Sequence, residues 1–378
     1  MAPIETSPDG TTGRRADLLT ERLRALVEVE TPTGDGPSLR RALELVAAAA
    51  REDLARVPDL LVADEAVPAL LLPATAEPRV LLLCHVDTVW PRGTLATIPF
   101  AVADGRATGP GGYDMKAGIV IALEALRRSD ARDHATLLVT SDEEMGSVGS
   151  RALIEATAAG CAAVLVLEGS GPGGALKHAR KGMGFYEIEI EGRAAHSGTE
   201  PERGVNATVE LAHLVLDLAA LGDPAAGTSV TPTAARSGTT PNTVPAAATL
   251  AVDVRAWRAS EQARVDAAIR GRSPAVPGAT VRIGGGINRG PLEPESSAGL
   301  LSLAREVAAG LGHAPLEGAA VGGASDGNLT AAMGIPTLDG VGAVGGNGHA
   351  PGEWVDLASL PERAALVAGL IDRIARGG

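Results

Sequence analysis

Val80-Leu-Leu-Leu-Cys84-His85-Val86-Asp87 is a short apolar run that ends in a histidine and an acid. A continuous apolar run of this length is typical of a strand covered on both faces, as in a parallel sheet between layers of helices. Two further runs of this kind, 135–140 and 162–167, are separated by helical periodicity at 117–128 and 149–159. This alternation predicts an α/β fold with a mixed, mostly parallel sheet between helices.

Residues 179–288 have a different pattern, which is typical of an α+β domain. Tyr186-Glu-Ile-Glu-Ile-Glu191 alternates strictly and predicts an antiparallel strand with one exposed face. The chain of 378 residues is long enough for two domains, so we expect a larger domain, 1–178 and 289–378, around this insertion. The other helices and strands that the sequence predicts are helices at 15–29, 38–57, 205–220, 260–271 and 358–376 and strands at 228–236, 247–256 and 279–284.

The composition excludes some classes of partner. The net charge of -13 and the lack of basic clusters argue against nucleic acid and against anionic membrane surfaces. No apolar run reaches membrane-spanning length and the first residues lack a secretory signal, so the sequence predicts a cytoplasmic protein. Cys84 and Cys161 both lie in apolar runs and are interpreted as buried thiols.

Polar residues follow each of the three apolar runs. His85 and Asp87 follow the first, Asp142-Glu143-Glu144 follows the second and Glu168 follows the third. Parallel strands present their carboxyl ends at one edge of a sheet, and acids gathered there repel one another unless a cation neutralises them. Any one of these acids alone is better explained as a solvated loop residue, but the three positions together favour a metal site. The spacing of His85 and Asp87 also lets the aspartate orient the imidazole as a ligand.

Glycine-rich loops contain three more candidates. Asp114 lies in Gly109-Pro-Gly-Gly-Tyr-Asp-Met-Lys-Ala-Gly118, ahead of a predicted helix, where a carboxylate either serves a site or only caps the helix. His196 and His349 lie in tight glycine-flanked loops, which often carry function. The other histidines are interpreted as bystanders: His134, His178, His213 and His313.

With these residues in place, the chain resembles the co-catalytic zinc family of glutamate carboxypeptidases, aminoacylases, acetylornithine deacetylases and succinyl-diaminopimelate desuccinylases. The resemblance spans almost the whole length and is specific, because many motifs occur in order. These motifs are His85-Val-Asp-Thr-Val-Trp-Pro-Arg-Gly93, Gly109 to Gly118, Ser141-Asp-Glu-Glu-Met-Gly146, Glu168, His196-Ser-Gly198, Asn242-Thr-Val-Pro245, Asp253-Val-Arg255 and the His349 loop.

The resemblance implies a zinc aminopeptidase-like catalytic domain with two Zn2+ ions per subunit. Asp114 would bridge the two ions, His85 and Glu168 would complete one site, and Glu144 and His349 would complete the other. Co2+ or Mn2+ would also suit such oxygen-rich mixed sites.

The resemblance also implies roles for residues that do not bind metal. Glu143 would be the general base, and His196 would reach into the active site of a partner subunit. Asn242 and Arg255 would hold the carboxylate of the substrate, although from the sequence alone an ordinary salt bridge explains Arg255 equally well. The insertion would be a lid and dimerisation domain, so the resemblance implies a homodimer.

The motifs are closest to the glutamate carboxypeptidase branch. They imply hydrolysis of the amide bond of an N-acyl amino acid or of a C-terminal amino acid in a peptide. An N-deacylase of the acetylornithine deacetylase or aminoacylase type is the alternative within the family. Tyr113 departs from the family pattern, because a small residue is expected immediately before Asp114.

Three interpretations from other classes compete with this one. Gly323-Ala-Ser325-Asp-Gly327, followed by Asp339 and His349, fits the order of a serine hydrolase, although 319–323 is a poor central strand. A dinucleotide site is weaker, because Asp114 stands where the third glycine of that motif belongs. A non-catalytic metal-binding relative would need neither Glu143 nor His196.

Overall fold

The computed structural model describes residues 10–64 and 67–377, which form two compact units. The first unit contains the described residues up to His178, then Pro294–Ala320 and the residues from Ser325 onward. The second unit consists of Ala179–Glu293 and Val321–Ala324, so it ends at Glu293 rather than at residue 288 and includes a short return segment. In the part of the chain described here, no helix is long and apolar enough to cross a membrane.

A six-stranded mixed sheet forms the centre of the first unit, in the order β1-β2-β6-β3-β7-β14. β6, β3, β7 and β14 are parallel, whereas β1 and β2 add an antiparallel hairpin at one edge. The predicted α/β fold class is confirmed, but the sequence did not predict the hairpin. The strands are β1 (Asp59–Asp64), β2 (Val67–Leu72), β3 (Val80–His85), β6 (Ala135–Thr140), β7 (Ala163–Val166) and β14 (Thr337–Leu338).

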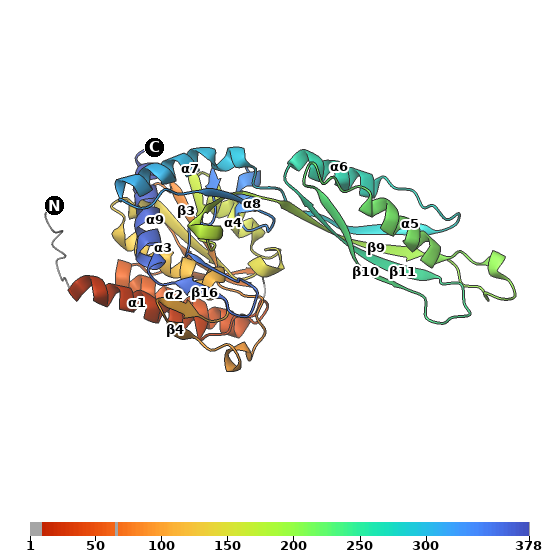
Figure 1. The fold of residues 1–378 in the computed structure, drawn as a ribbon, viewed down its shortest axis with the longest axis horizontal. Coiled ribbons are helices and arrows are strands. Elements are labelled where there is room, and N and C mark those ends of the chain that lie inside the picture. Colours follow the sequence, from red (N-terminus) through yellow and green to blue (C-terminus); the bar gives the residue numbers. More distant parts are fainter. Residues whose placement is uncertain (1–9, 65–66, 378) are drawn as a thin grey trace. The chain divides into compact units, whose positions relative to one another are not determined.

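Helices cover both faces of this sheet (Figure 1). In β3 alternate residues face opposite layers: Leu82 and Cys84 belong to one hydrophobic cluster, and Leu81 and Leu83 belong to the other. Burial of each leucine contributes roughly 1.5–3 kcal/mol, which is why a continuous apolar run is stable only between two layers. One layer contains α1 (Gly10–Val27), α2 (Gly36–Leu54), α3 (Ala117–Arg128), α7 (Pro294–Gly310) and α9 (Ser359–Ala375), and the other contains α4 (Arg151–Ala158) and α8 (Gly327–Ala332).

One smaller sheet completes the first unit, and a two-stranded pair contains residues of both units. In the four-stranded sheet β15-β16-β5-β4, Trp354 pairs with Thr108, so the loop before β16 and the loop after β5 start from neighbouring strands. These loops carry His349 and Asp114, respectively. The strands are β4 (Ala101–Ala103), β5 (Arg106–Thr108), β15 (Gly345–Gly346) and β16 (Trp354–Asp356), with β8 (Leu176–Arg180) and β13 (Gly318–Val321) in a separate pair.

The second unit is an antiparallel sheet, β10-β11-β9-β12, with α5 and α6 on one face (Figure 1). Tyr186, Ile188 and Ile190 of β9 are buried against the helices, while the acids between them are exposed. The predicted alternation of this strand is confirmed. The elements are β9 (Gly182–Glu191), α5 (Ala207–Ala219), β10 (Ser229–Ser237), β11 (Ala247–Ala256), α6 (Ala259–Arg270) and β12 (Thr280–Arg289).

Candidate metal centre

The carboxyl ends of three parallel strands bring the first group of polar side chains together. His85 is the last residue of β3 and is aligned with Thr140, the last residue of β6. The acidic stretch 142–144 follows β6, and Glu168 follows β7, the other neighbour of β3. The sheet register therefore places these side chains at one edge, as the sequence predicts.

Asp114 reaches the same edge from the loop that precedes α3. It lies in a short irregular helical turn, Gly112–Lys116, and a cis peptide bond joins Asp114 to Met115. At Gly118, a Cβ atom would lie 2.0 Å from the carbonyl oxygen of Leu167. The start of α3 therefore contacts the chain directly before Glu168, and this close approach holds Asp114 beside Glu168.

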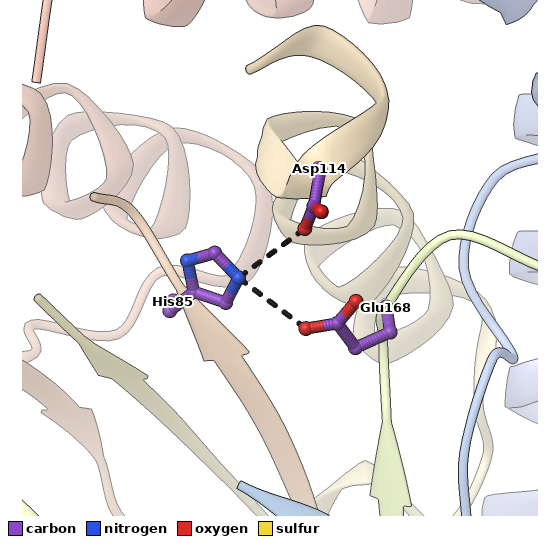
Figure 2. A group of neighbouring side chains, drawn as sticks. All are labelled: His85, Asp114 and Glu168. Carbon is purple, nitrogen blue, oxygen red and sulfur yellow. Dashed lines mark ion pairs between the residues drawn. The ribbon is translucent and has the colours of Figure 1, made fainter. Parts of the chain in front are cut away.

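His85, Asp114 and Glu168 form the first cluster of candidate ligands (Figure 2). The Nε2 atom of His85 lies 3.4 Å from Oδ1 of Asp114 and 3.3 Å from Oε1 of Glu168. In Figure 2 the two carboxylates approach the same imidazole nitrogen from the helix and from the chain after β7. The His85 side chain is 2% exposed.

Asp114, Glu144 and His349 form the second cluster. The Nε2 atom of His349 lies 3.2 Å from Oδ2 of Asp114 and 3.2 Å from Oε2 of Glu144. His349 is half exposed and has a positive φ of 63°, in a turn between β15 and β16. Asp114 thus directs one carboxylate oxygen toward each cluster.

The electrostatics of the centre favour cations. The carboxylates of Asp114 and Glu144 raise the pKa of His349 to about 11. Burial opposes protonation of His85, but Asp114, Asp87 and Glu168 prevail and raise its pKa well above the usual value. Burial also raises the pKa of Glu144, whereas the two imidazoles hold that of Asp114 well below its ordinary value despite burial. Both imidazoles thus lie in a strongly negative potential.

The ligand atoms fit a metal better than they fit one another. His85 Nε2 and Glu144 Oε1 are buried, and neither makes a hydrogen bond of acceptable geometry with a described group. Buried polar atoms are normally paired, and atoms that converge on a common point lose hydrogen-bond alignment with each other. Imidazole nitrogen with carboxylate oxygen is a donor set that suits Zn2+, and Co2+ or Mn2+ as well.

Asp87 connects the first cluster to the acidic turn. Its Oδ1 atom lies 3.3 Å from Nδ1 of His85, on the opposite side of the ring from the metal-facing nitrogen. Its carboxylate also accepts the backbone N–H groups of Glu143 and Glu144 at 3.3 and 3.2 Å, and the hydroxyl of Thr33 at 2.8 Å. The backbone carbonyl of Asp87 also lies 3.1 Å from Nδ1 of His85, and acceptors in this position fix the tautomer and orientation of a ligating imidazole. Asp87 also orients both glutamates.

Glu143 differs from its neighbour Glu144 in its surroundings. Both lie in a short helical turn, Glu143–Met145, and only Glu144 belongs to a candidate metal cluster. Glu143 is partly exposed, and its backbone is fixed by Asp87. A carboxylate that neighbours a candidate ligand in the chain but belongs to neither candidate cluster is suited to proton transfer.

Glu353 is a buried acid at the centre that sequence reasoning missed. Its carboxylate accepts four N–H groups, from Gly111 and Tyr113 at 2.9 Å and from Asp114 and the Trp90 indole at 3.0 Å. Burial raises its pKa, although these donors oppose the shift. One side chain therefore fixes the backbone of Asp114, the residue common to both candidate clusters. No signal in the sequence distinguishes it from a solvated loop acid.

Replacing Glu353 with glutamine removes one acceptor oxygen from this arrangement. Each buried donor left without an acceptor costs about 1–3 kcal/mol, so urea unfolding should show a clear loss of stability. Metal affinity should fall about 10–100-fold, as is typical of residues that orient ligands. The matched control is the exposed Glu317→Gln. Equal metal affinities for the Glu353 variant, the control and the wild type would show that Glu353 does not position Asp114.

His196 and Asn242 lie in two paired loops of the second unit. The backbone N–H of Ser197 donates to the carbonyl of Asn242 at 3.0 Å. The His196 Nδ1 atom accepts the N–H groups of Gly198 at 3.1 Å and Thr199 at 3.2 Å. Because Nδ1 accepts, the neutral ring carries its proton on Nε2 and offers an N–H donor to solvent. His196 and Asn242 are both exposed.

Arg255 is engaged in an ion pair on its own strand. Its guanidinium donates to the carboxylate of Asp253 at 3.0 Å and lies 5.6 Å from the centre of the Phe185 ring. The side chain is 27% exposed. The structure thus contains the salt bridge that the sequence offered as the alternative role of Arg255. A substrate carboxylate would have to share the guanidinium with Asp253 or displace Asp253 from it.

The serine hydrolase interpretation is wrong. Ser325 is fully buried and its hydroxyl donates directly to Asp339 at 2.5 Å, which leaves no place for a base between them. His349 lies against Asp114 and Glu144 instead. The strand before the turn belongs to the small β8–β13 pair rather than to the central sheet.

Ser325→Ala tests this correction. The variant should retain turnover, because the contacts of the hydroxyl are buried structural hydrogen bonds, one donated to Asp339 and one accepted from the Gly327 N–H. Its unfolding free energy should fall by about 1–3 kcal/mol, because Asp339 loses a donor. Turnover and urea unfolding are compared with those of the exposed Ser302→Ala. A folded Ser325→Ala protein without activity would revive the serine enzyme.

Comparison with known proteins identifies the family. The sequence model of peptidase family M20/M25/M40 matches residues 81–373. Carboxypeptidase G2 of Pseudomonas sp. (strain RS-16) is 32% identical over 381 residues, covering 94% of this chain and 89% of that protein.

Solved structures share the fold. Aminopeptidase PepT of Bacillus cereus has a TM-score of 0.73 at 21% identity, covering 95% of this chain and 99% of its own. A Bacillus subtilis M20 protein described as a dinuclear metal binding peptidase has a TM-score of 0.65 at 15% identity, covering 96% and 99%. The family match spans most of the chain, and the resemblance seen in the motifs is confirmed. The chain belongs to peptidase family M20/M25/M40 and is a metallo-hydrolase similar to carboxypeptidase G2.

Proposed function

We propose that the protein is a two-metal hydrolase that cleaves the amide bond of an N-acyl amino acid or of a C-terminal amino acid in a peptide. One observation carries the proposal: the two oxygens of Asp114 each face a separate cluster, one with His85 and Glu168 and one with Glu144 and His349. A bridging carboxylate between two such clusters is the arrangement of a two-metal site. The similarity to carboxypeptidase G2 supports the choice of substrate bond.

The five residues of the clusters would hold two Zn2+ ions, with Co2+ or Mn2+ as suitable replacements. Bound metal lowers the pKa of a coordinated water from 15.7 to about 7 and stabilises negative charge on the substrate oxygen. Glu143 takes the proton of the attacking water and returns it to the leaving amine. Asp87 holds the His85 imidazole and the 143–145 turn in fixed positions during both proton transfers.

His196 is assigned to the carbonyl oxygen of the substrate. The Gly198 and Thr199 N–H groups occupy Nδ1, so the neutral ring directs an Nε2–H donor outward. A preorganised N–H donor stabilises the negative charge that develops on the carbonyl oxygen during attack. Asn242, on the loop paired with His196, and Arg255 are assigned to the carboxylate of the substrate.

The homodimer is part of the proposal. Val209 and Leu216, seven residues apart on α5, are 45% and 71% exposed, which leaves an apolar stripe on the second unit. Residues at this spacing share one helix face. A partner subunit on this face would bury the stripe, and we assign His196 to the metal centre of that partner, as the family resemblance implies.

Turnover of a substrate panel tests the proposed reaction. Release of free amino acid is measured with an acyl-glutamate, an acyl-ornithine and a dipeptide, before and after treatment with a chelator. The proposal predicts activity on the acyl-glutamate or the dipeptide, loss on chelation and recovery with Zn2+. Exclusive activity on acyl-ornithine would favour the N-deacylase alternative. Absence of turnover across the panel in metal-loaded protein would favour a non-catalytic relative.

Subunit mixing tests the role of His196 across the dimer. Glu143→Gln and His196→Ala proteins, each inactive alone, are mixed under conditions in which exchange is verified. A hybrid dimer then contains one intact pairing of Glu143 with the partner's His196, so activity should return to a fraction of the wild-type value. Verified exchange without activity would contradict action across the dimer.

A further inference from the structure

Tyr113 is the residue of the metal centre that departs from the pattern expected of the family, and its ring is close to both chain segments that carry outer candidate ligands, at Gly169 and at Gly348. The residue immediately precedes Asp114, and its hydroxyl donates to the carbonyl of Ser170. Its backbone N–H donates to Glu353 at 2.9 Å. The side chain is partly buried and packs against the large hydrophobic cluster of the first unit. Tyr113 is therefore anchored at its backbone and at the far end of its ring.

Gly169 provides the space for the hydroxyl end of the ring. A Cβ atom at this position would lie 2.3 Å from both Cε2 and Cζ of Tyr113 and 2.8 Å from Cε1. These three ring atoms are the nearest obstacles, and the backbone of Gly169 has no positive φ that would require glycine. The ring is therefore the first obstacle that a side chain at this position would meet. Gly169 directly follows Glu168, a ligand of the first cluster.

The loop that carries His349 also leaves space for the ring, near the end of the ring that joins the backbone. A Cβ atom at Gly345 would lie 2.5 Å from Cδ2 of Tyr113, although the Trp354 carbonyl is closer still at 2.2 Å. A Cβ atom at Gly348 would lie 3.5 Å from Cδ1 of Tyr113. Tyr113 therefore packs against the residue that follows one candidate ligand and against the residue that precedes another.

We infer that Tyr113 is a positioning residue whose ring sets the spacing between the Glu168 segment and the His349 loop, and that Gly169 is its matched partner. The inference rests on the proposed metal centre. An aromatic ring has only two side-chain torsions, so it separates the two segments rigidly. The bridging Asp114 follows in the next position, so one residue links the spacing of the outer ligands to that of the shared one.

The experiment is a double-mutant cycle at Tyr113 and Gly169, read out as metal binding. Wild type, Tyr113→Ala, Gly169→Ala and the double variant are stripped of metal and titrated with Zn2+ by calorimetry. Co2+ spectra of the same proteins report the ligand geometry. Each single variant should lose about 10–100-fold in affinity for at least one ion and show an altered Co2+ spectrum. In the double variant the added methyl group meets no ring, so Gly169→Ala should cost nothing further in the Tyr113→Ala background.

Milder variants and matched controls keep the result interpretable. Tyr113→Phe removes only the hydrogen bond to Ser170 and should fold even if Tyr113→Ala is unstable, with a smaller loss of affinity. Gly299 on α7 has open space around its Cα, so Gly299→Ala should leave metal binding unchanged. Tyr186→Phe, which loses a hydrogen bond to Asp266 in the second unit, should also leave it unchanged.

Two results would overturn the inference. In the first, Gly169→Ala lowers metal affinity and the thermal unfolding temperature of the metal-free protein equally in the wild-type and Tyr113→Ala backgrounds. The other is wild-type affinity and an unaltered Co2+ spectrum in both Tyr113 variants. A wild-type protein that binds no metal would instead contradict the proposed function, and the unfolding data on metal-free proteins separate that failure from the first.

Discussion

Glu143→Gln should lower kcat by about 10²–10⁴-fold while the protein keeps its full metal content. The physical reason is that the amide cannot accept the proton of the attacking water or return it to the leaving amine. Glu143 belongs to neither cluster, so its replacement leaves every candidate ligand in place. Initial rates over a range of substrate concentrations and elemental analysis of the same preparation measure both quantities.

The neighbouring acid supplies the contrast for this prediction. Glu144→Gln removes a candidate ligand of the second cluster, so it should lose metal as well as activity. If Glu143→Gln loses metal and Glu144→Gln keeps it, the roles of the two residues are reversed. Substantial turnover by a metal-loaded Glu143→Gln protein would remove Glu143 from the role of base.

Asp114→Asn should have the largest effect on metal binding, because Asp114 is the residue common to both clusters. The amide loses the negative charge and presents only one good ligand oxygen in place of two. Affinity for both ions should fall by more than about 100-fold, beyond the range found for residues that merely orient ligands. Equilibrium dialysis with Zn2+ measures the loss, with the exposed Asp130→Asn as the control. Release of one ion only would show that Asp114 does not bridge.

The sequence predicts the strands of the central sheet and the side chains at their ends because both signals are local. The run Val80–His85 is buried along its whole length, and the residues that follow the three strands meet at one edge through the sheet register. The β1–β2 hairpin was missed, although its residues are partly apolar. The burial of β2 is mixed, so its sequence is neither a continuous apolar run nor a strict alternation of apolar and polar residues, which are the two patterns that indicate a strand.

The role of Glu353 and the contact between Tyr113 and Gly169 could not be predicted from local sequence patterns. Glu353 contacts Gly111 and Tyr113 across more than half the chain, through a strand of only three residues that pairs with another short strand. The sequence marks Tyr113 as unusual, but the glycine that accommodates it lies on a different strand end. The serine hydrolase motif was misleading for the opposite reason, because its signal is local. Gly-x-Ser-x-Gly indicates a tight turn, but it does not indicate which sheet contains the strand before that turn.

The number of Zn2+ ions bound per chain tests the central claim most directly. Metal-free wild type and Glu168→Gln are dialysed against buffered Zn2+, and the metal-to-protein ratio is measured by elemental analysis. Two clusters that share Asp114 predict a ratio of two for the wild type and of one for Glu168→Gln, which keeps only the second cluster complete. A wild-type ratio of zero, or a ratio of two retained in Glu168→Gln, would contradict the account.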